Sequence, residues 1–249
     1  MRVVAIHNAK GGVGKTTVAT NVAYLASRSS RVCLIDADPQ GSATAYLVKA
    51  KGYQYELADV LVSDGAVTVQ SVIITLEPRL CLLPTKGLTG GLKGYGETKL
   101  IQEPLVFDDL NEILRGLGFD LVIYDLSPGL SQLERCVILA ADEVVIPVEG
   151  EYFSIEGLEA AGTAVDTINR KFKREVSHRR LVVNKVNASM RRHTASLEEY
   201  RKLPFEVYVI PQESKLAEAQ FDHTPLALFY PGSRALPELE RLTADLVRN

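Results

Sequence analysis

Nearly continuous apolar runs recur along the chain, and longer stretches with helix-like spacing of apolar residues separate them. Such runs are typical of parallel strands covered on both faces, because side chains pointing either way are then buried. The runs predict seven strands, at residues 2–7, 31–36, 79–84, 119–125, 142–148, 180–186 and 206–211.

The stretches between these strands favour helices. Residues 16–28 place Val18, Val22 and Leu25 on one face, and residues 105–117 repeat the pattern. Alternation of strands and helices indicates βαβ units with right-handed crossovers. We therefore predict an α/β fold, with a doubly wound, mostly parallel sheet flanked by helices.

Neither an internal repeat nor a low-complexity linker interrupts this alternation, so residues 1–249 are expected to form a single domain. The least regular stretch is the glycine-rich segment 85–98, which we expect to be a surface loop. The start of the chain predicts a strand rather than a targeting segment, and no apolar stretch approaches the roughly 18 residues of a membrane span. We expect a cytoplasmic protein.

Composition excludes few functions. The net charge of −3 does not by itself predict nucleic-acid binding. The three cysteines, Cys33, Cys81 and Cys136, form no C-x-x-C pair, which argues against a metal or iron–sulfur site within one chain. The setting of Cys81 and Cys136 suggests apolar core residues, and the four histidines have no mutual spacing that indicates catalysis or metal binding.

The segment NAKGGVGKTT, residues 8–17, follows the first predicted strand and precedes a predicted helix. Glycines there let backbone N–H groups surround phosphates, and the helix N-terminus favours negative charge. Lys15 can reach the β- and γ-phosphates of a nucleotide, and the Thr16 hydroxyl can bind Mg²⁺. The alternative is a glycine turn with an incidental lysine. The predicted nucleotide-binding residues are Gly11, Gly12, Val13, Gly14, Lys15, Thr16 and Thr17.

The strict phosphate-loop pattern fails at its first position, Ala9, and a second lysine, Lys10, precedes the glycines. This form, K-G-G-x-G-K-T-T, resembles the deviant Walker A motif of the ParA/MinD group of P-loop ATPases. The resemblance implies slow, Mg²⁺-dependent ATP hydrolysis and an ATP-bound sandwich homodimer, in which Lys10 contacts the nucleotide of the partner subunit. A charge supplied in this way would neutralise the γ-phosphate as an arginine finger does. The alternative for Lys10 is a solvated loop residue.

Two further segments, LIDADPQGSAT and LVIYDLSPGLS, resemble the second motif and the Walker B strand of that group. Carboxylates at the ends of such strands lie over the nucleotide crevice. We assign Asp38 to orienting the attacking water, Asp36 to a Mg²⁺-bound water and Asp125 to the outer shell of the metal. The family usually reads D-x-P-P where residues 125–128 read Asp-Leu-Ser-Pro, which leaves open how this loop moves. For an isolated aspartate, a helix cap would be the simpler interpretation.

The resemblance also predicts how the base is bound. Asn184, in VVNKVN, is placed just past a strand, where its amide could pair with adenine. Pro211, in VIPQES, matches the loop on the other side of the base. An asparagine at a strand end is often only a turn residue.

ParA-like proteins bind double-stranded DNA non-specifically as ATP dimers, associate with the nucleoid, and are stimulated by a ParB-like partner. Residues 170–202 contain eleven lysines and arginines against three glutamates, a local charge of +8. Local basic density attracts phosphates even when the whole chain is acidic. The alternative is a set of scattered surface charges. The candidate DNA-binding residues are Arg191, Arg192, Arg234, Lys171 and Lys173.

A MinD-like positioning switch is the main alternative and would need an amphipathic membrane anchor at the end of the chain. The final segment, RALPELERLTADLVRN, has mixed charges and lacks the basic polar face of such anchors. We expect a helix docked on the core and no membrane partner. A nitrogenase-like reductase is disfavoured because the cysteines lack glycine-rich settings. The function predicted is ATP-dependent partitioning of a plasmid or chromosome.

Overall fold

A single mixed sheet forms the centre of the molecule. The computed structural model describes residues 1–49, 52–63, 65–150 and 154–248. Within these ranges the sheet has eight strands in the order β3-β4-β2-β5-β1-β6-β7-β8, all neighbours parallel except β3 and β4. This confirms the predicted doubly wound fold. The strands are β1 (Arg2–Ile6), β2 (Val32–Ala37), β3 (Ile74–Glu77), β4 (Leu80–Leu83), β5 (Leu121–Leu126), β6 (Glu143–Glu149), β7 (Ser177–Val186) and β8 (Glu206–Pro211).

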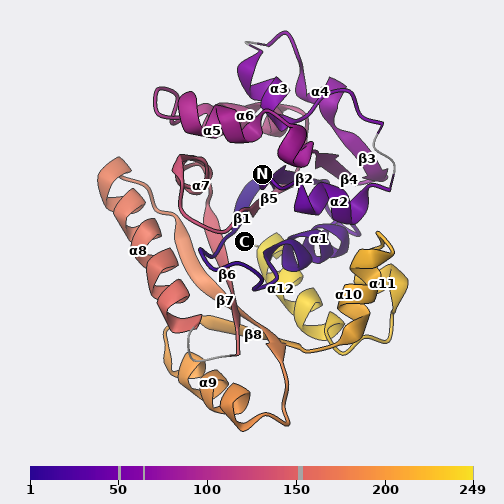
Figure 1. Ribbon diagram of the computed structural model, residues 1–249, viewed down its shortest axis with the longest axis vertical. Coiled ribbons are helices and arrows are strands. Elements are labelled where there is room, and N and C mark those ends of the chain that lie inside the picture. Colours follow the sequence, from indigo (N-terminus) through magenta and orange to yellow (C-terminus); the bar gives the residue numbers. More distant parts are fainter. Residues whose placement is uncertain (50–51, 64, 151–153, 249) are drawn as a thin grey trace.

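Helices cover both faces of the sheet (Figure 1). In β1, Val3 and Ala5 pack into the core on one face, while Val4 and Ile6 pack into the core on the other. Burial on both faces explains why the strands read as continuous apolar runs. The helices are α1 (Lys15–Ala26), α2 (Ser42–Leu47), α3 (Leu57–Val62), α4 (Val69–Val72), α5 (Leu92–Thr98), α6 (Val106–Gly116), α7 (Gln132–Leu139), α8 (Ser154–Phe172), α9 (Arg191–Lys202), α10 (Ser214–Phe221), α11 (Leu226–Phe229) and α12 (Leu236–Arg248), with a 3₁₀ turn η1 (Gly87–Thr89).

Four local features differ from the sequence prediction. Strand β3 was not expected, since a short antiparallel edge strand leaves little apolar signal. Segment 85–98 is not a plain loop, because η1 and α5 form there and α5 buries Leu92 and Tyr95. Asn184 lies within β7 rather than past its end, and Cys81 is only half-buried, unlike the buried Cys136.

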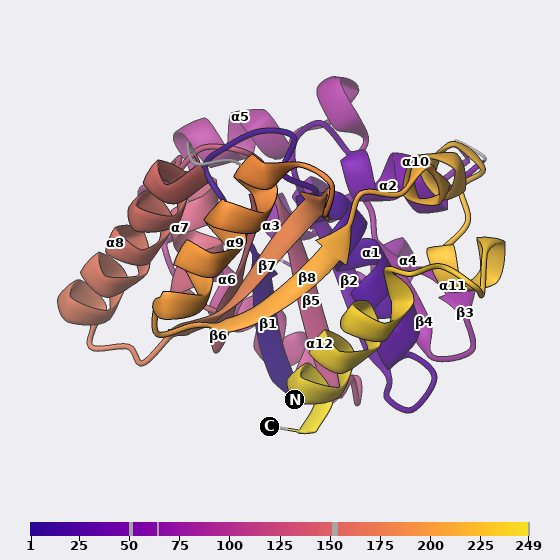
Figure 2. The same cartoon turned by 90° about the horizontal axis from the view of Figure 1, so that it is seen from below.

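Because the central strands are parallel, their carboxyl ends meet at one edge of the sheet. Both termini lie at the opposite edge (Figure 2). The loops that follow β1, β2, β5, β7 and β8 therefore gather at the first edge, which is where ligands bind in open α/β sheets.

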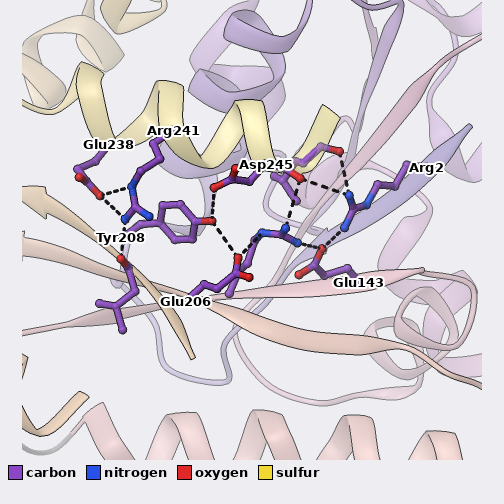
Figure 3. Close-up of polar contacts among 10 residues, drawn as sticks. Arg2, Glu143, Glu206, Tyr208, Glu238, Arg241 and Asp245 are labelled. Carbon is purple, nitrogen blue, oxygen red and sulfur yellow. Dashed lines mark hydrogen bonds and ion pairs between the residues drawn. The ribbon is translucent and has the colours of Figure 1, made fainter. Parts of the chain in front are cut away.

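A polar network fastens α12 to the opposite edge (Figure 3). Arg2 and Arg180 both bind the buried carboxylate of Glu143, and Arg2 also donates to the carbonyl of Leu246. The Tyr208 hydroxyl donates to Asp245 Oδ2 at 2.8 Å. This network holds the last helix against the sheet.

The apolar face of α12 packs into the core, with Leu239, Leu242 and Leu246 buried. The expected core-docked helix is therefore present. Across the ranges that the structure describes, no helix combines the length and apolarity that a membrane crossing requires.

Candidate phosphate and nucleotide site

The glycine loop between β1 and α1 depends on two backbone conformations that favour glycine. Gly12 and Gly14 have φ angles of 77° and 92°. A Cβ on Gly14 would lie 2.0 Å from Asn184 Nδ2, whereas a Cβ on Gly12 would meet nothing within 4 Å. Val13 is fully buried and contributes its carbonyl, which accepts from Asn184 Nδ2 at 2.9 Å. Asn184 therefore packs directly on the loop.

Lys15 begins α1 and turns its ammonium back into the loop. Its Nζ donates to the carbonyls of Asn8 and Lys10, at 3.1 and 3.0 Å. Burial lowers the pKa of Lys15, while the carboxylates of Asp125 and Asp38 oppose that change. The loop thus contains a cation that is largely removed from water.

Asn8 is a loop-organising residue that the sequence analysis missed. It is completely buried, its Nδ2 donates to the carbonyl of Pro147, and its Oδ1 accepts from the backbone N of Lys10. These bonds tie the start of the loop to β6. The only sequence signal was an asparagine three residues before the first glycine, which is too common in turns to be distinctive.

Three aspartates predicted from the sequence converge beside the loop. Asp36 on β2 is in register with Asp125 on β5, and Asp38 follows β2. Burial raises the pKa of Asp36 to about 7, although its hydrogen bonds from Thr44 favour the ionised form. Burial also raises the pKa of Asp38, whose Oδ1 accepts from the backbone N of Gln40.

Asp125 is the most exceptional of these groups. Burial, with the charge of Asp36 next, raises its pKa well above the usual value, and Thr16 opposes the rise. Even so, both carboxylate oxygens are buried and lack a hydrogen-bond partner among the described residues. An unsatisfied buried carboxylate costs free energy, and a cation would relieve that cost.

The donor set suits a cation that also binds phosphate. The described residues contain no group of three or more His, Cys, Asp and Glu side chains that could enclose a metal. Mg²⁺ is usually held by one or two carboxylates together with waters and substrate phosphates. Asp36, Asp125 and the Thr16 hydroxyl fit that kind of site.

Two adjoining cavities follow the loop. The first has a volume of about 430 Å³ and is lined by Gly12, Lys15, Thr16 and Asp38 among others. The second, of about 380 Å³, contains both Asn184 and Pro211. The residues that line both cavities are Thr17, Lys185 and Gln220. The structure thus brings the predicted phosphate-binding and base-binding residues to one continuous depression.

The loop after β5 contains the departure from D-x-P-P. The Ser127 hydroxyl donates to the buried carboxylate of Glu134, which also accepts from the backbone N of Ser131 at 2.7 Å. On its other side, Gly129 N donates to the carbonyl of Ala9 in the phosphate loop. A serine in place of the usual proline therefore links this loop to the start of α7.

Lys10 lies at the rim of the site. Its Nζ is 3.7 Å from Glu149 Oε2, and its side chain is 37% exposed. Lys185 Nζ lies 2.7 Å from Glu149 Oε1 and donates to the carbonyl of Gly12. Glu149 and Lys185 received no role from the sequence, because their contacts join segments distant along the chain.

The basic residues of segment 170–202 do not form one patch. Arg191 and Arg192 are exposed at the start of α9, after the carboxyl end of β7, whereas Lys171 and Lys173 are exposed at the far end of α8 (Figure 2). Arg180, which contributed to the local charge, is buried against Glu143 and faces the core.

Arg234 is also exposed and lies two residues before the start of α12. Its neighbour Ser233 donates to Glu213, which follows β8. This contact places Arg234 near the end of β8. The start of α9 lies on the other side of β7, so Arg234 is separate from Arg191 and Arg192.

Comparisons with known proteins identify relatives along the whole chain. A family described as an AAA domain matches residues 1–178. The chain is 30% identical over 253 residues to the sporulation initiation inhibitor protein Soj of Bacillus subtilis, covering 100% of this chain and 99% of that protein. It is 32% identical over 260 residues to the chromosome-partitioning ATPase Soj of Thermus thermophilus, covering 99% and 96%.

Solved structures share the fold. McdA of Cyanothece has a TM-score of 0.86 at 22% identity, covering 99% of both chains. A plasmid partition protein of Borrelia burgdorferi has a TM-score of 0.80 at 24% identity, covering 98% of this chain and 97% of that one. With the family match and the full-length relatives, these findings establish that the chain belongs to the ParA/Soj family of partition ATPases.

Proposed function

We propose that this protein is a Mg²⁺-dependent ATPase that partitions DNA, a plasmid or a chromosome, by switching between nucleotide states. One observation carries the proposal: Lys15, Thr16 and Asp38 line one depression at the carboxyl edge of the sheet, and the buried carboxylates of Asp36 and Asp125 lie close behind them. In that arrangement a cation for the phosphates and carboxylates for a metal lie side by side.

Each residue then has a defined task. Backbone N–H groups of the glycine loop and Lys15 bind the phosphates, while Asp38 orients the water that attacks the γ-phosphate. Thr16, Asp36 and Asp125 hold Mg²⁺ directly or through water, and the ion neutralises charge that develops on the phosphates. Asn184 and Pro211, which line the second cavity, contact the base.

Related structures support the choice of ligand. The plasmid partition protein of Borrelia burgdorferi was solved with AMPPNP, and McdA of Cyanothece with ATP. For this chain we propose the same ligand class. Binding is followed by slow hydrolysis that a ParB-like partner stimulates.

In the ATP state two subunits form a sandwich dimer in which Lys10 reaches the nucleotide of the partner subunit. Lys10 lies at the exposed rim of the site, and its side chain is not buried. Two such cationic loops repel each other until bound phosphates neutralise them, so dimerisation depends on ATP.

The dimer binds double-stranded DNA without sequence preference, which places the protein on the nucleoid. Arg191 and Arg192 support this, because both are exposed at the carboxyl edge, on the side of the molecule that holds the nucleotide. The competing role, a MinD-like membrane switch, is disfavoured because the apolar face of α12 is packed on the sheet.

The test is fluorescence anisotropy of a random-sequence duplex with ATP, with ADP and without nucleotide, at two salt concentrations. We expect salt-sensitive binding with ATP only, because phosphate contacts release counterions. Lys10→Ala is the matched variant and should lose this binding while retaining ATP. Absence of DNA binding in every nucleotide state would refute the DNA part of the proposal.

A further inference from the structure

Glu149 joins the two exposed lysines of the site. It is the last residue of β6, so its side chain lies at the carboxyl edge of the sheet. One oxygen, Oε2, is 3.7 Å from Lys10 Nζ, and the other, Oε1, is 2.7 Å from Lys185 Nζ. A single carboxylate therefore serves as counter-ion to both cations.

Lys185 has a backbone conformation that residues other than glycine rarely adopt. Its φ of 56° lies in the left-handed region, which is uncommon for a residue other than glycine. The pairing of β7 with β8 is irregular between Val183 and Val186, and Lys185 N donates to Asn184 Oδ1 at 2.8 Å. This local geometry directs Lys185 Nζ to the carbonyl of Gly12, at 2.6 Å. Strained residues of this kind cluster at functional sites.

We propose that Glu149 holds Lys10 on its own subunit when ATP is absent, and so sets the nucleotide concentration at which two subunits join. Glu149 is in this sense a positioning residue that acts through Lys10. The inference rests on the proposed ATP-controlled dimer.

The physical argument is competition for one ammonium group. In the free subunit Lys10 pairs with Glu149, whereas in the dimer it must pair with the nucleotide of the partner subunit. Breaking the first contact opposes dimerisation, and it occurs twice in each dimer.

The experiment measures dimerisation by analytical ultracentrifugation against the concentration of AMPPNP with Mg²⁺. Glu149→Gln should lower the half-saturating AMPPNP concentration by roughly two- to ten-fold, the range expected for two partly exposed ion pairs. The shift should shrink at high salt. Glu240→Gln is the matched control, because Glu240 also pairs with a cation, Arg28 at 3.5 Å, but lies remote from the loop.

A double variant, Lys10→Ala with Glu149→Gln, shows whether Glu149 acts through Lys10. It should behave as Lys10→Ala alone. The inference is wrong if Glu149→Gln matches Glu240→Gln, or if it shifts the curve equally in the Lys10→Ala background. If the wild-type protein stays monomeric with AMPPNP, the proposed dimer fails and the inference with it, whereas a wild-type dimer unaffected by Glu149→Gln overturns the inference alone.

Discussion

Asp36 shows how a single buried carboxyl links the site to stability. The side chain is completely buried, and its pKa is raised from 3.8 to about 7. In the folded protein it therefore keeps its proton at pH values where the unfolded chain has released it. Stability from this group is fully present below pH 4 and is lost as the pH rises towards 7.

Replacing Asp36 by Asn should remove that pH dependence. The free energy of unfolding of the variant, relative to wild type, should rise between pH 4 and 7 and then stay level, by up to about 4 kcal/mol for three pKa units. Urea unfolding at several pH values without nucleotide measures this. A flat difference for Asp36→Asn would contradict the raised pKa.

Gly14 and Gly12 offer a matched pair of substitutions in the phosphate loop. Both have left-handed φ angles, but only at Gly14 does a new Cβ meet a side chain, that of Asn184. Gly14→Ala should destabilise the fold by about 1–3 kcal/mol more than Gly12→Ala, because a clash adds to the backbone strain. Chemical denaturation compares the two variants.

Gly14→Ala and Gly12→Ala should also differ in their effects on nucleotide affinity. Gly14→Ala should displace Asn184 from the carbonyl of Val13 and weaken binding of a fluorescent adenine nucleotide more than that of inorganic triphosphate. Gly12→Ala should affect both ligands equally. If Gly14→Ala, like Gly12→Ala, weakened the binding of both ligands equally, Asn184 would not contribute to the base site.

At the scale of residues, the sequence predicted the site residues that belong to one local motif. Gly12, Gly14 and Lys15 are adjacent along the chain, and their spacing is legible without a structure. Asn8 and Glu149 were missed, because their roles arise from contacts with β6 and β7 that only the folded sheet creates.

At the scale of elements, α5 illustrates structure that depends on a distant anchor. The buried carboxylate of Glu56 accepts from the backbone N of Lys86 and of Gly91, each at 2.5 Å, and so fixes both ends of the turn before α5. The sequence predicted a loop there because five glycines dominate residues 85–98 and the anchor lies some thirty residues earlier.

Glu56→Ala should therefore loosen this segment selectively. The backbone donors of Lys86 and Gly91 would lose their charged, buried partner, at a cost of about 2–5 kcal/mol. Amide hydrogen exchange should accelerate in η1 and α5 while protection in β1 and β5 is kept. Glu97→Ala, which removes only an exposed pair with Lys93 on α5, should change the stability by less than about 0.5 kcal/mol. Unchanged exchange in Glu56→Ala would show that burial of Leu92 and Tyr95 suffices.

For the whole molecule, the succession of strands along the chain was predictable because every strand except β3 carries its own apolar run. The distribution of charge was not. Segment 170–202 is compact along the chain, but α8, β7 and α9 run back and forth across the height of the sheet, so its basic residues are divided between two edges. A local count of charges therefore predicted attraction to DNA without locating it.

This division makes the DNA-binding surface testable with two charge-matched double variants. Arg191→Ala with Arg192→Ala removes two charges at the nucleotide edge, and Lys171→Ala with Lys173→Ala removes two at the other edge. Because ATP changes the protein at the nucleotide edge, we expect the arginine pair to weaken ATP-dependent binding more. Each lost phosphate contact should also reduce the slope of log affinity against log salt by about 1.

Anisotropy titrations of the same random-sequence duplex across a salt series measure both quantities. A shallower slope for the arginine variant alone places the DNA along the start of α9, where nucleotide state and DNA affinity share one edge of the sheet. A shallower slope for the lysine variant alone places the DNA at the end of α8. In that case the nucleotide signal must cross the full height of the sheet, and α8, which begins at the carboxyl edge and ends beside Lys171, is the element that spans it.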